Sequence, residues 1–344
     1  MSAHATKSDA SSPGEDWEGL SARFAERLDL RPAPGVGFAH YGARLLLSVG
    51  LLGACWGWFH GVQPQGLLRV VAWCIAGFAM VQCGMLGHDL GHGYLPGGMR
   101  RTRWVGHLLV TFPTGLSFDH WCTQHAAHHR RTHDALGDPD LQVDPLALGD
   151  QQVAPSRAAL AIRRTQGWWF WAVPAVQPVS MRLNSWRHLF QPEGRSGVAV
   201  AALVAHYTLW LVVPVVVFDR SFGGAFLDWF AHSSIGGFYM AGVFFVNHLG
   251  RPTWTGARPH RMEISVARSR SLSPHPLVTL LMAGLNHHAE HHLLPNVPTH
   301  QLAQVRTALE GACADVRVRY PRFTFVGALA EMYAGVWRLG REAR

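Results

Sequence analysis

Four long apolar stretches constrain the fold of this chain of 344 residues more than any other feature. They cover residues 45–63, 70–87, 197–218 and 229–247, and none contains Asp, Glu, Lys or Arg. Each is close to the length of about 20 residues that an α-helix needs to cross a bilayer. Short turns join the first stretch to the second and the third to the fourth, so the sequence predicts two membrane hairpins.

Composition supports this prediction. Charged residues make up 15% of the chain, against about 25% in typical soluble domains. The formal net charge is +8, yet we find no nucleic-acid-binding motif. Most arginines lie outside the hairpin turns, among them Arg100, Arg101, Arg103, Arg130 and Arg131. By the positive-inside rule, we expect both termini and the segment between the hairpins to lie in the cytoplasm.

The remaining segments are more polar. Residues 1–40 lack the apolar core of a signal peptide, and we expect a flexible lead with one short helix at 16–28. The apolar piece 105–118 is too short to span, so it is re-entrant or lies in the interface. The aromatic cluster 168–171 is typical of the headgroup level, and 301–316 is predicted helical. The scattered cysteines contain no C-x-x-C pair, which excludes a thiolate zinc site.

Histidines gather in three clusters at the ends of these segments. The first, in HDLGH, follows the second apolar stretch, the second lies in HAAHH, and the third lies in HAEHH. A single His248 follows the fourth stretch. Residues i, i+3 and i+4 share one face of a helix, so each cluster directs two or three imidazoles to one point. The predicted topology places all of them on one side of the membrane.

Neutral imidazole is a good ligand for first-row transition metals. The three clusters and His248 comprise His88, His92, His125, His128, His129, His248, His288, His291 and His292. Nine histidines exceed the ligand number of one ion, so two ions are the natural count. Ligand type alone leaves iron and zinc open. His287 lies i, i+4 from His291 and is an alternative ligand to His288.

The motifs GHDLGH, WCTQHAAHH with RRTHDALGDPD after it, and GLNHHAEHHLLPNVP resemble those of the membrane fatty acid desaturase family. The resemblance covers about residues 40–335, giving a flexible segment 1–40, a desaturase domain 41–335 and a C-terminal tail 336–344. It implies that these nine histidines hold two irons, with O2 as co-substrate. The expected fold class is an all-α integral membrane protein, with four transmembrane helices in two hairpins and a cytosolic histidine-rich helical cap that holds the di-metal site.

Further site residues follow from the chemistry of metal ligands. Ligating imidazoles usually donate their second N–H to a carboxylate or carbonyl, and the candidate acceptors are Asp89, Glu290, Asp138 and Asp140. Asn247 and Asn286 are candidates for contact with a metal through water. Five arginines of the loop 251–270 are candidates for binding the phosphate of a carrier or lipid headgroups: Arg251, Arg258, Arg261, Arg268 and Arg270.

The resemblance implies an O2-dependent desaturase that introduces a C=C bond into an acyl chain carried by a lipid, CoA or acyl carrier protein. The chain has L-P-G-G at 95–98 and no H-P-G-G haem motif. We therefore expect electrons from a separate ferredoxin or cytochrome b5-type protein with its reductase. Related histidine-box enzymes hydroxylate or otherwise oxidise alkyl chains and carotenoids, and that alternative stays open. A metal transporter or sensor is a third interpretation, although transporters place ionisable residues at the bilayer midplane.

Overall fold

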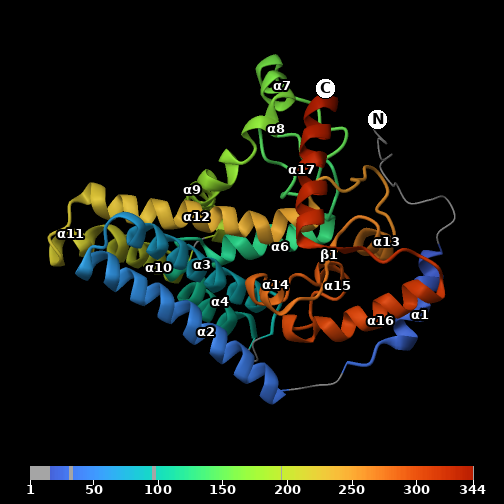
Figure 1. Ribbon diagram of the computed structural model, residues 1–344, viewed down its shortest axis with the longest axis horizontal. Coiled ribbons are helices and arrows are strands. Elements are labelled where there is room, and N and C mark those ends of the chain that lie inside the picture. Colours follow the sequence, from blue (N-terminus) through green and yellow to red (C-terminus); the bar gives the residue numbers. More distant parts are fainter. Residues whose placement is uncertain (1–15, 31–33, 95–97, 195, 344) are drawn as a thin grey trace. The chain divides into compact units, whose positions relative to one another are not determined.

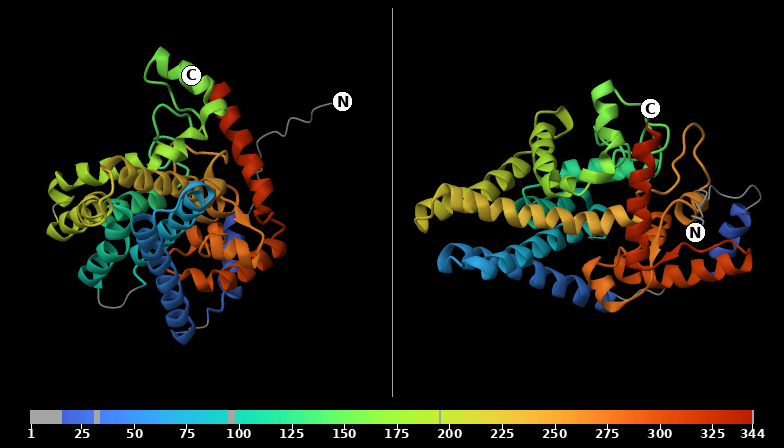
Figure 2. Two further views of the ribbon diagram at one scale, coloured as in Figure 1. Left: turned by 60° about the vertical axis from the view of Figure 1, so that its left-hand side comes forward. Right: turned by 45° about the horizontal axis from the view of Figure 1, so that its top comes forward.

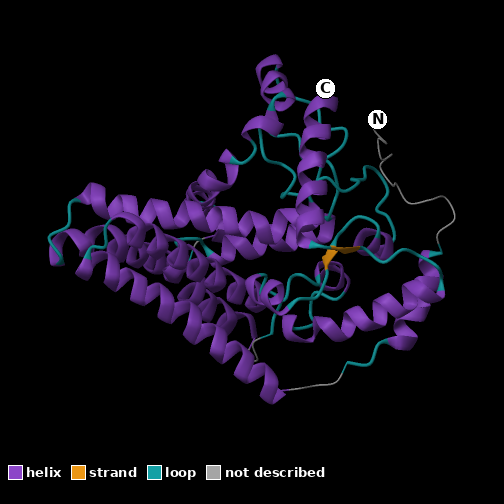
Figure 3. Ribbon diagram, in the orientation of Figure 1, coloured by secondary structure: helices purple, strands orange, loops and turns teal. Residues whose placement is uncertain are grey.

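A computed structural model describes residues 16–30, 34–94, 98–194 and 196–343 (Figure 1). These residues are mostly helical, and among them only β1 (Ser271–Leu272) and β2 (Arg322–Phe323) form strands, which pair in parallel (Figure 3). The chain divides into two compact units. Unit 1 comprises the described residues of 1–32, 126–170 and 243–344, and unit 2 those of 33–125 and 171–242. Helices α6 (Phe118–Arg131) and α12 (Phe222–His248) run through the division without a break.

Unit 2 contains the long apolar helices. Besides parts of α6 and α12, its elements are α2 (Pro34–Gly57), η1 (Trp58–Val62), α3 (Gly66–Gly91), α4 (Gly98–Gly106), η2 (His107–Thr111), α5 (Phe112–Thr114), α9 (Ala172–Leu189), η3 (Pro192–Gly194), α10 (Gly197–Tyr207), η4 (Thr208–Val212) and α11 (Val213–Val217). Here α2 and α3 pack as an antiparallel pair, joined by a short turn after η1 (Figure 1). The apolar piece 105–118 is divided between α4, η2, α5 and the start of α6, with Gly115 at φ 72° ending α5.

Within the described residues, three helical segments have the length and composition to cross a membrane: Gly37–Val62, Gly66–Gly91 and Gly197–Val217. In an apolar stretch of 18 residues within each segment, only 28% and 22% of the residues are buried in the first and third, against 61% in the second. Their outward faces are therefore apolar and uncovered, as in Leu46 and Val216, which are 77% and 76% exposed. Such large apolar surfaces mark contact with lipid or protein.

The predicted fourth span lies within α12, which has 27 residues but is not among these three segments. This helix contains several polar side chains, among them Asp228, His232 and Asn247. Asp228 is buried and accepts hydrogen bonds from Arg69 (2.8 Å), Trp73 (2.9 Å) and Arg220 (3.0 Å). One carboxylate thus binds the start of α3 and the turn before α12 to α12 itself.

A second buried guanidinium ties α9 into unit 2. Arg182 is 2% exposed and donates to the Thr114 carbonyl (2.7 Å) and to Ser233 Oγ (3.0 Å). Its guanidinium also lies 4.7 Å from the Trp229 ring centroid. Hydrogen bonds and a cation–π contact offset part of the cost of burying this charge.

Unit 1 is built from shorter elements around its own core. They are α1 (Trp17–Arg27), α7 (Arg157–Arg164), α8 (Gln166–Trp169), α13 (Arg261–Val266), α14 (Pro276–Leu281), α15 (His288–Leu293), η5 (Thr299–Gln301), α16 (Leu302–Asp315) and α17 (Phe325–Glu342). The amphipathic α1 lies along α16 (Figures 1 and 2), where Leu20 and Phe24 join a core that includes Val305 and Leu309. Arg27 fixes this pair of helices through Asp315, at 2.6 Å.

Several predicted segments compare directly with these elements. The helices expected at 16–28 and 301–316 are α1 and α16. In the aromatic cluster, Trp168 is 79% exposed, whereas Phe170 is fully buried. A boundary at residue 335 falls inside α17, where Val336 and Leu339 are buried. Residues 1–15 and 31–33 of the expected flexible lead, and 95–97 of the L-P-G-G stretch, lie outside the described residues.

Close helix contact in unit 2 depends on Gly77. A Cβ at Gly77 would lie 2.7 Å from the His232 carbonyl oxygen and 3.0 Å from the Gly236 nitrogen, both backbone atoms of α12. We expect Gly77→Val to lower stability by about 1–3 kcal/mol because α3 and α12 must separate. Thermal unfolding in detergent measures this. Gly53→Val in α2 is the control, because a Cβ there has no atom within 4 Å; equal losses in both variants would contradict the packing argument.

Candidate metal centre

Six of the nine predicted ligands lie in unit 1. Helix α6 supplies His128 and His129, the end of α12 supplies His248, and α15 supplies His288, His291 and His292. Helix α15 begins immediately after Gly284 (φ 88°) and the turn that follows it, so the last histidine cluster starts a new helix. The i, i+3, i+4 spacing then directs these imidazoles inward, and all three are less than 8% exposed.

Three ring nitrogens meet at one point in this unit. The Nε2 atom of His248 lies 2.6 Å from that of His288 and 3.1 Å from that of His292, and the last two are 3.2 Å apart. The ring of His128 is also close, 4.8 Å from His248 between centroids. His129 Nε2 lies 3.1 Å from His291 Nε2.

The outer nitrogens of His128 and His292 have partners that fix the tautomers of these two rings. His128 Nδ1 lies 2.8 Å from Asp138 Oδ1 and therefore carries the proton. Thr132 Oγ1 donates to the His128 carbonyl at 2.9 Å, which leaves its lone pair for His292 Nδ1–H at 3.3 Å. The neutral forms of both rings direct Nε2 lone pairs toward the centre. Although burial lowers the pKa of His128, the Asp138 and Asp140 carboxylates raise it to about 9, so its Nε2 proton must leave when a metal binds.

Converging lone pairs require a cation. For metal–nitrogen bonds of about 2.1 Å, neighbouring ligands of an octahedral ion lie about 3.0 Å apart, and those of a tetrahedral ion about 3.4 Å apart. The Nε2 separations of 2.6–3.2 Å among His248, His288 and His292 fit the sixfold arrangement better. Burial, reinforced by His129 and His288, holds the pKa of His292 well below its usual value, so the imidazole is neutral. The residues present therefore fit a transition-metal ion.

The other three predicted ligands form a second cluster in unit 2. Their ligand atoms lie within 4.8 Å of one another, and His92 Nε2 is 2.9 Å from His125 Nε2. His88 and His92 come from the end of α3, and His125 from α6. The Trp121 ring stacks on His125 at 4.6 Å. Burial lowers the pKa of His92 to about 3, which keeps this imidazole neutral too.

The predicted carboxylates have different roles. Asp138 binds His128 through Oδ1 and the His133 backbone N–H through Oδ2, at 2.8 and 2.9 Å. Asp140 lies 3.4 Å from His128 Nδ1, but its side chain is 56% exposed. Asp89 faces His88 Nδ1 at 3.2 Å and accepts from Arg44 at 2.9 Å.

Glu290 binds hydroxyl groups. The buried carboxyl accepts from Ser271 Oγ at 2.7 Å and from the Tyr320 hydroxyl. Burial raises the pKa of Glu290, and these two hydrogen bonds oppose the shift. Ser271 Oγ also accepts from the Ala289 backbone at 3.1 Å, so the carboxyl positions α15 through its backbone.

The two predicted asparagines are fully buried in unit 1. Asn247 donates to the Val243 carbonyl at 2.8 Å, and its Oδ1 has no partner among the described residues. Neither amide atom of the Asn286 side chain has a partner in that part of the chain. Buried amides usually bind protein or ordered water, so contact through water remains a proposal for both.

Three of the five arginines predicted to bind a carrier or headgroups make internal contacts. Arg270 is fully buried, with Glu331 at 2.6 Å, and Arg268 lies 2.6 Å from Glu263. Arg251 lies 3.7 Å from Glu331 and donates to the Ala267 carbonyl. Arg258 and Arg261 are exposed, and carrier or headgroup binding by the loop stays a prediction.

Sequence reasoning left out several residues that hold the ligands. His133 Nε2 lies 3.1 Å from His248 Nδ1, and His133 is 1% exposed with φ 62°. Thr132, Tyr320 and Arg44 also support ligands or their partners. His133 and Thr132 adjoin the second motif, but only tertiary structure identifies their partners.

The chain matches the family model described as "Fatty acid desaturase" over residues 64–324. It belongs to the fatty acid desaturase family. Among similar curated proteins is the Delta(8)-fatty-acid desaturase of Euglena gracilis, 26% identical over 296 residues, covering 80% of this chain and 67% of that protein. Others are the acyl-lipid (9-3)-desaturase of Borago officinalis, 22% identical over 277 residues (75% and 61%), and the fatty acid desaturase 2-like protein FADS2B of Mus musculus, 24% identical over 293 residues (82% and 58%). The desaturase chain thus spans roughly three fifths of the length of several such relatives.

The geometry discriminates between His287 and His288. His288 Nε2 joins His248 and His292, whereas no ring nitrogen of His287 lies within hydrogen-bonding distance of another described histidine. We expect His288→Ala to lower the amount of transition metal bound per protein, since the cluster in unit 1 loses a ligand. His287→Ala should keep the wild-type content. Elemental analysis of purified protein measures both, and metal loss confined to His287→Ala would reverse the assignment.

Asp138 provides a test of ligand orientation. We expect Asp138→Asn to weaken metal affinity about 10–100-fold, because the amide no longer fixes the tautomer of His128 as the carboxylate does. Competition with a chelator measures the change. Asp219→Asn is the matched control, since Asp219 is exposed in the turn before α12 and its positive φ of 51° suits Asn. An affinity unchanged in Asp138→Asn would exclude this role.

Proposed function

We propose that this protein is an O2-dependent fatty acyl desaturase that introduces a C=C bond into an acyl chain. The observation that carries the proposal is the convergence of His248, His288 and His292 Nε2 atoms at 2.6–3.2 Å in a member of the desaturase family. The desaturase names of its relatives favour desaturation over the hydroxylation or carotenoid oxidation of related enzymes. The buried, closely spaced imidazoles also argue against transport, which requires a metal to leave.

We further propose that two iron ions are bound, one by each histidine cluster. In unit 2, His88, His92 and His125 would hold the first. In unit 1, His128, His248, His288 and His292 would hold the second ion. His129 and His291 are the remaining two of the nine predicted ligands. When bound, such a pair of ions supplies the activation of O2 needed to break an unactivated methylene C–H bond, which side chains alone cannot do.

The reaction balances with an external reductant. Two adjacent CH2 groups lose two hydrogen atoms and become CH=CH, and this oxidation yields two electrons. Together with two electrons from a ferredoxin or cytochrome b5-type donor and two protons, it reduces one O2 to two water molecules. The protein orients the imidazoles through Asp138, Asp89 and His133, and burial keeps bulk water from the ligands.

The topology is part of the proposal. We infer a multi-pass integral membrane protein in which α12 is the fourth span and the two hairpins place both termini and the histidines in the cytoplasm. The apolar, uncovered faces of Gly37–Val62 and Gly197–Val217 support membrane insertion. The arginine distribution supports the orientation. The desaturase domain would then comprise residues 41–335, and the part of α17 after residue 335 would lie outside it.

Expression in a host of defined lipid composition tests the function. We expect a new unsaturated acyl chain with the wild-type protein and its loss, by more than 100-fold, with His248→Ala, while the variant remains in the membrane fraction. Gas chromatography with mass spectrometry identifies a double bond or a hydroxyl group. His275→Asn is the control, because His275 is exposed and only caps α14, a role that Asn also performs. A hydroxylated product, or full activity in His248→Ala, would reject the proposal.

A further inference from the structure

Trp254 connects the surface of unit 1 to the histidines of the candidate metal centre. Its ring is half-buried, and its indole N–H donates to the Thr132 carbonyl at 2.9 Å. The side chain of Thr132 in turn accepts from His292 Nδ1–H, with 3.3 Å between Oγ1 and Nδ1. Two hydrogen bonds and a single intervening residue therefore join this indole to a predicted metal ligand.

A second path starts from the backbone of the same residue. The Trp254 N–H donates to the His133 carbonyl at 2.8 Å, and His133 Nε2 lies 3.1 Å from His248 Nδ1. Electrons tunnel faster through covalent and hydrogen bonds than across gaps of the same length. The two paths thus couple Trp254 to His248 and His292, whose Nε2 atoms lie 3.1 Å apart.

Contacts on both sides hold the loop that carries Trp254. The backbone N–H and the hydroxyl of Thr253 donate to Asp150 Oδ2 at 3.1 and 3.0 Å. At the start of the loop, Gly250 packs so closely on α17 that a Cβ at Gly335 would lie 2.3 Å from Gly250 Cα. The position of the indole relative to the ligands is therefore fixed before any partner binds.

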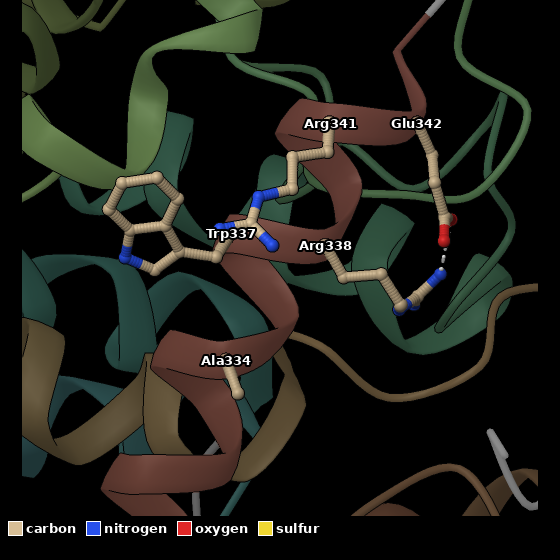
Figure 4. Close-up of a pocket in the computed structure, with 5 residues that line it drawn as sticks. All are labelled: Ala334, Trp337, Arg338, Arg341 and Glu342. Atoms are coloured by element: carbon tan, nitrogen blue, oxygen red, sulfur yellow. Dashed lines mark hydrogen bonds and ion pairs between the residues drawn. The ribbon is translucent and has the colours of Figure 1, made fainter. Parts of the chain in front are cut away.

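Asp150 connects this loop to a hollow at the end of α17. The hollow has a volume of about 520 Å³ and is lined by Ala334, Trp337, Arg338, Arg341 and Glu342 (Figure 4). There Arg338 donates to Glu342 at 2.9 Å and to Asp150 at 2.8 Å, so its charge is compensated. Arg341 lies 5.3 Å from the Trp337 ring centroid and has no carboxylate partner among the described residues.

The charge of the loop itself is positive. Residues 251–261 include three arginines and no acidic residue. Arg258 follows Trp254 by four residues, is exposed, and has no carboxylate partner in the part of the chain that the structure describes. Together, Arg258 and Arg341 add two uncompensated cations to a surface that contains two half-buried tryptophans.

This combination suits a protein partner better than a lipid surface. Tryptophan and arginine are enriched at protein interfaces and contribute much of their binding energy. Tryptophans that anchor a protein in a membrane insert their rings at the headgroup level, whereas Trp254 is partly covered and Trp337 lines a hollow. A partner with carboxylates on its surface complements these charges, and such complementarity accelerates the encounter of two proteins.

We propose that Trp254 is the point where electrons enter, and that the surface containing Trp254, Arg258 and Arg341 docks an acidic one-electron carrier protein. This inference rests on the proposed function and identifies where its reductant binds. Each docked donor is oxidised by one electron, which passes through Trp254 and its hydrogen bonds to the ion held in unit 1, and no covalent bond forms or breaks. Two encounters supply the two electrons that the reaction requires. Complexes for electron transfer are small and weak, so one ring and a few charges suffice.

Stopped-flow absorbance on the purified holoenzyme tests the path. The oxidised protein is mixed without O2 with a reduced soluble cytochrome b5 domain, and in a parallel series with a reduced plant-type ferredoxin. We expect at least one probe to be oxidised. Trp254→Leu should lose most of the rate at saturating donor while it keeps the wild-type metal content. Trp254→Phe retains a ring without the N–H, so its rate should be intermediate, and it decides the question if Trp254→Leu loses metal.

Donor binding is measured separately, by isothermal titration with the oxidised donor, which transfers no electron. Arg258→Gln and Arg341→Gln should each raise the Kd about two- to fivefold at low salt, as for the loss of one exposed ion pair. The difference should shrink at high salt because such pairs are screened. Arg319→Gln is the charge-matched control, since Arg319 is exposed in the loop between α16 and β2, and it should bind the donor as the wild type does.

Three results would overturn the inference: no oxidation of either probe, an undiminished rate in both Trp254 variants, or wild-type donor affinity in both Arg258→Gln and Arg341→Gln. If these two arginine variants instead lost only binding to phosphatidylglycerol vesicles, the surface would be assigned to lipid. Donor oxidation that depends on Trp254 without any unsaturated acyl product would reject the proposed function alone. An unsaturated product together with an undiminished rate in the Trp254 variants would reject this inference alone.

Discussion

Imidazole lone pairs that point at one another are the constraint on which unit 1 depends. Neutral nitrogens 2.6–3.2 Å apart gain nothing from their proximity unless a proton or a cation lies between them. Because Thr132 accepts from Nδ1–H of His292, the proton of this neutral ring lies on its outer nitrogen and not on its inner one. Contacts between the surrounding chain and the outer nitrogens hold the rings in this arrangement. Asp138, in the loop after α6, makes one of these contacts with His128.

The sequence predicted this chemistry because histidine spacing is local. The patterns in α3, α6 and α15 are i, i+3 or i, i+4, and such spacing determines a shared helix face without knowledge of the fold. The apolar stretches were also recognisable from the sequence alone. Three of the four correspond to helical segments with the length and composition to cross a membrane. Asp138 and Asp89 were predicted because metal-bound imidazoles require acceptors and these acids lie near them in the sequence.

Contacts between distant segments were not predictable in the same way. His133 became a partner of His248 only through a left-handed backbone conformation, 115 residues away from it. Glu290 was expected to bind an imidazole, but it accepts from Ser271 of β1 and from Tyr320 in the loop before β2. The fourth apolar stretch lies in α12, where Asp228 accepts a hydrogen bond from Arg69 of α3. Hydropathy alone does not reveal this contact. Each case depends on pairing across the fold.

Arg270 illustrates how contacts between distant segments affect the interpretation of genetic variation. Its Nη1 donates to the Val246 and Leu249 carbonyls at 3.0 and 2.9 Å, and its backbone N–H donates to the Asn247 carbonyl at 3.0 Å. The arginine thus closes the C-terminus of α12 on both sides of His248. A missense allele here would impair the enzyme and mimic a defect in substrate recognition, although its origin would be a frayed helix end. Clinical or evolutionary surveys of this family should therefore weigh such arginines with the ligands.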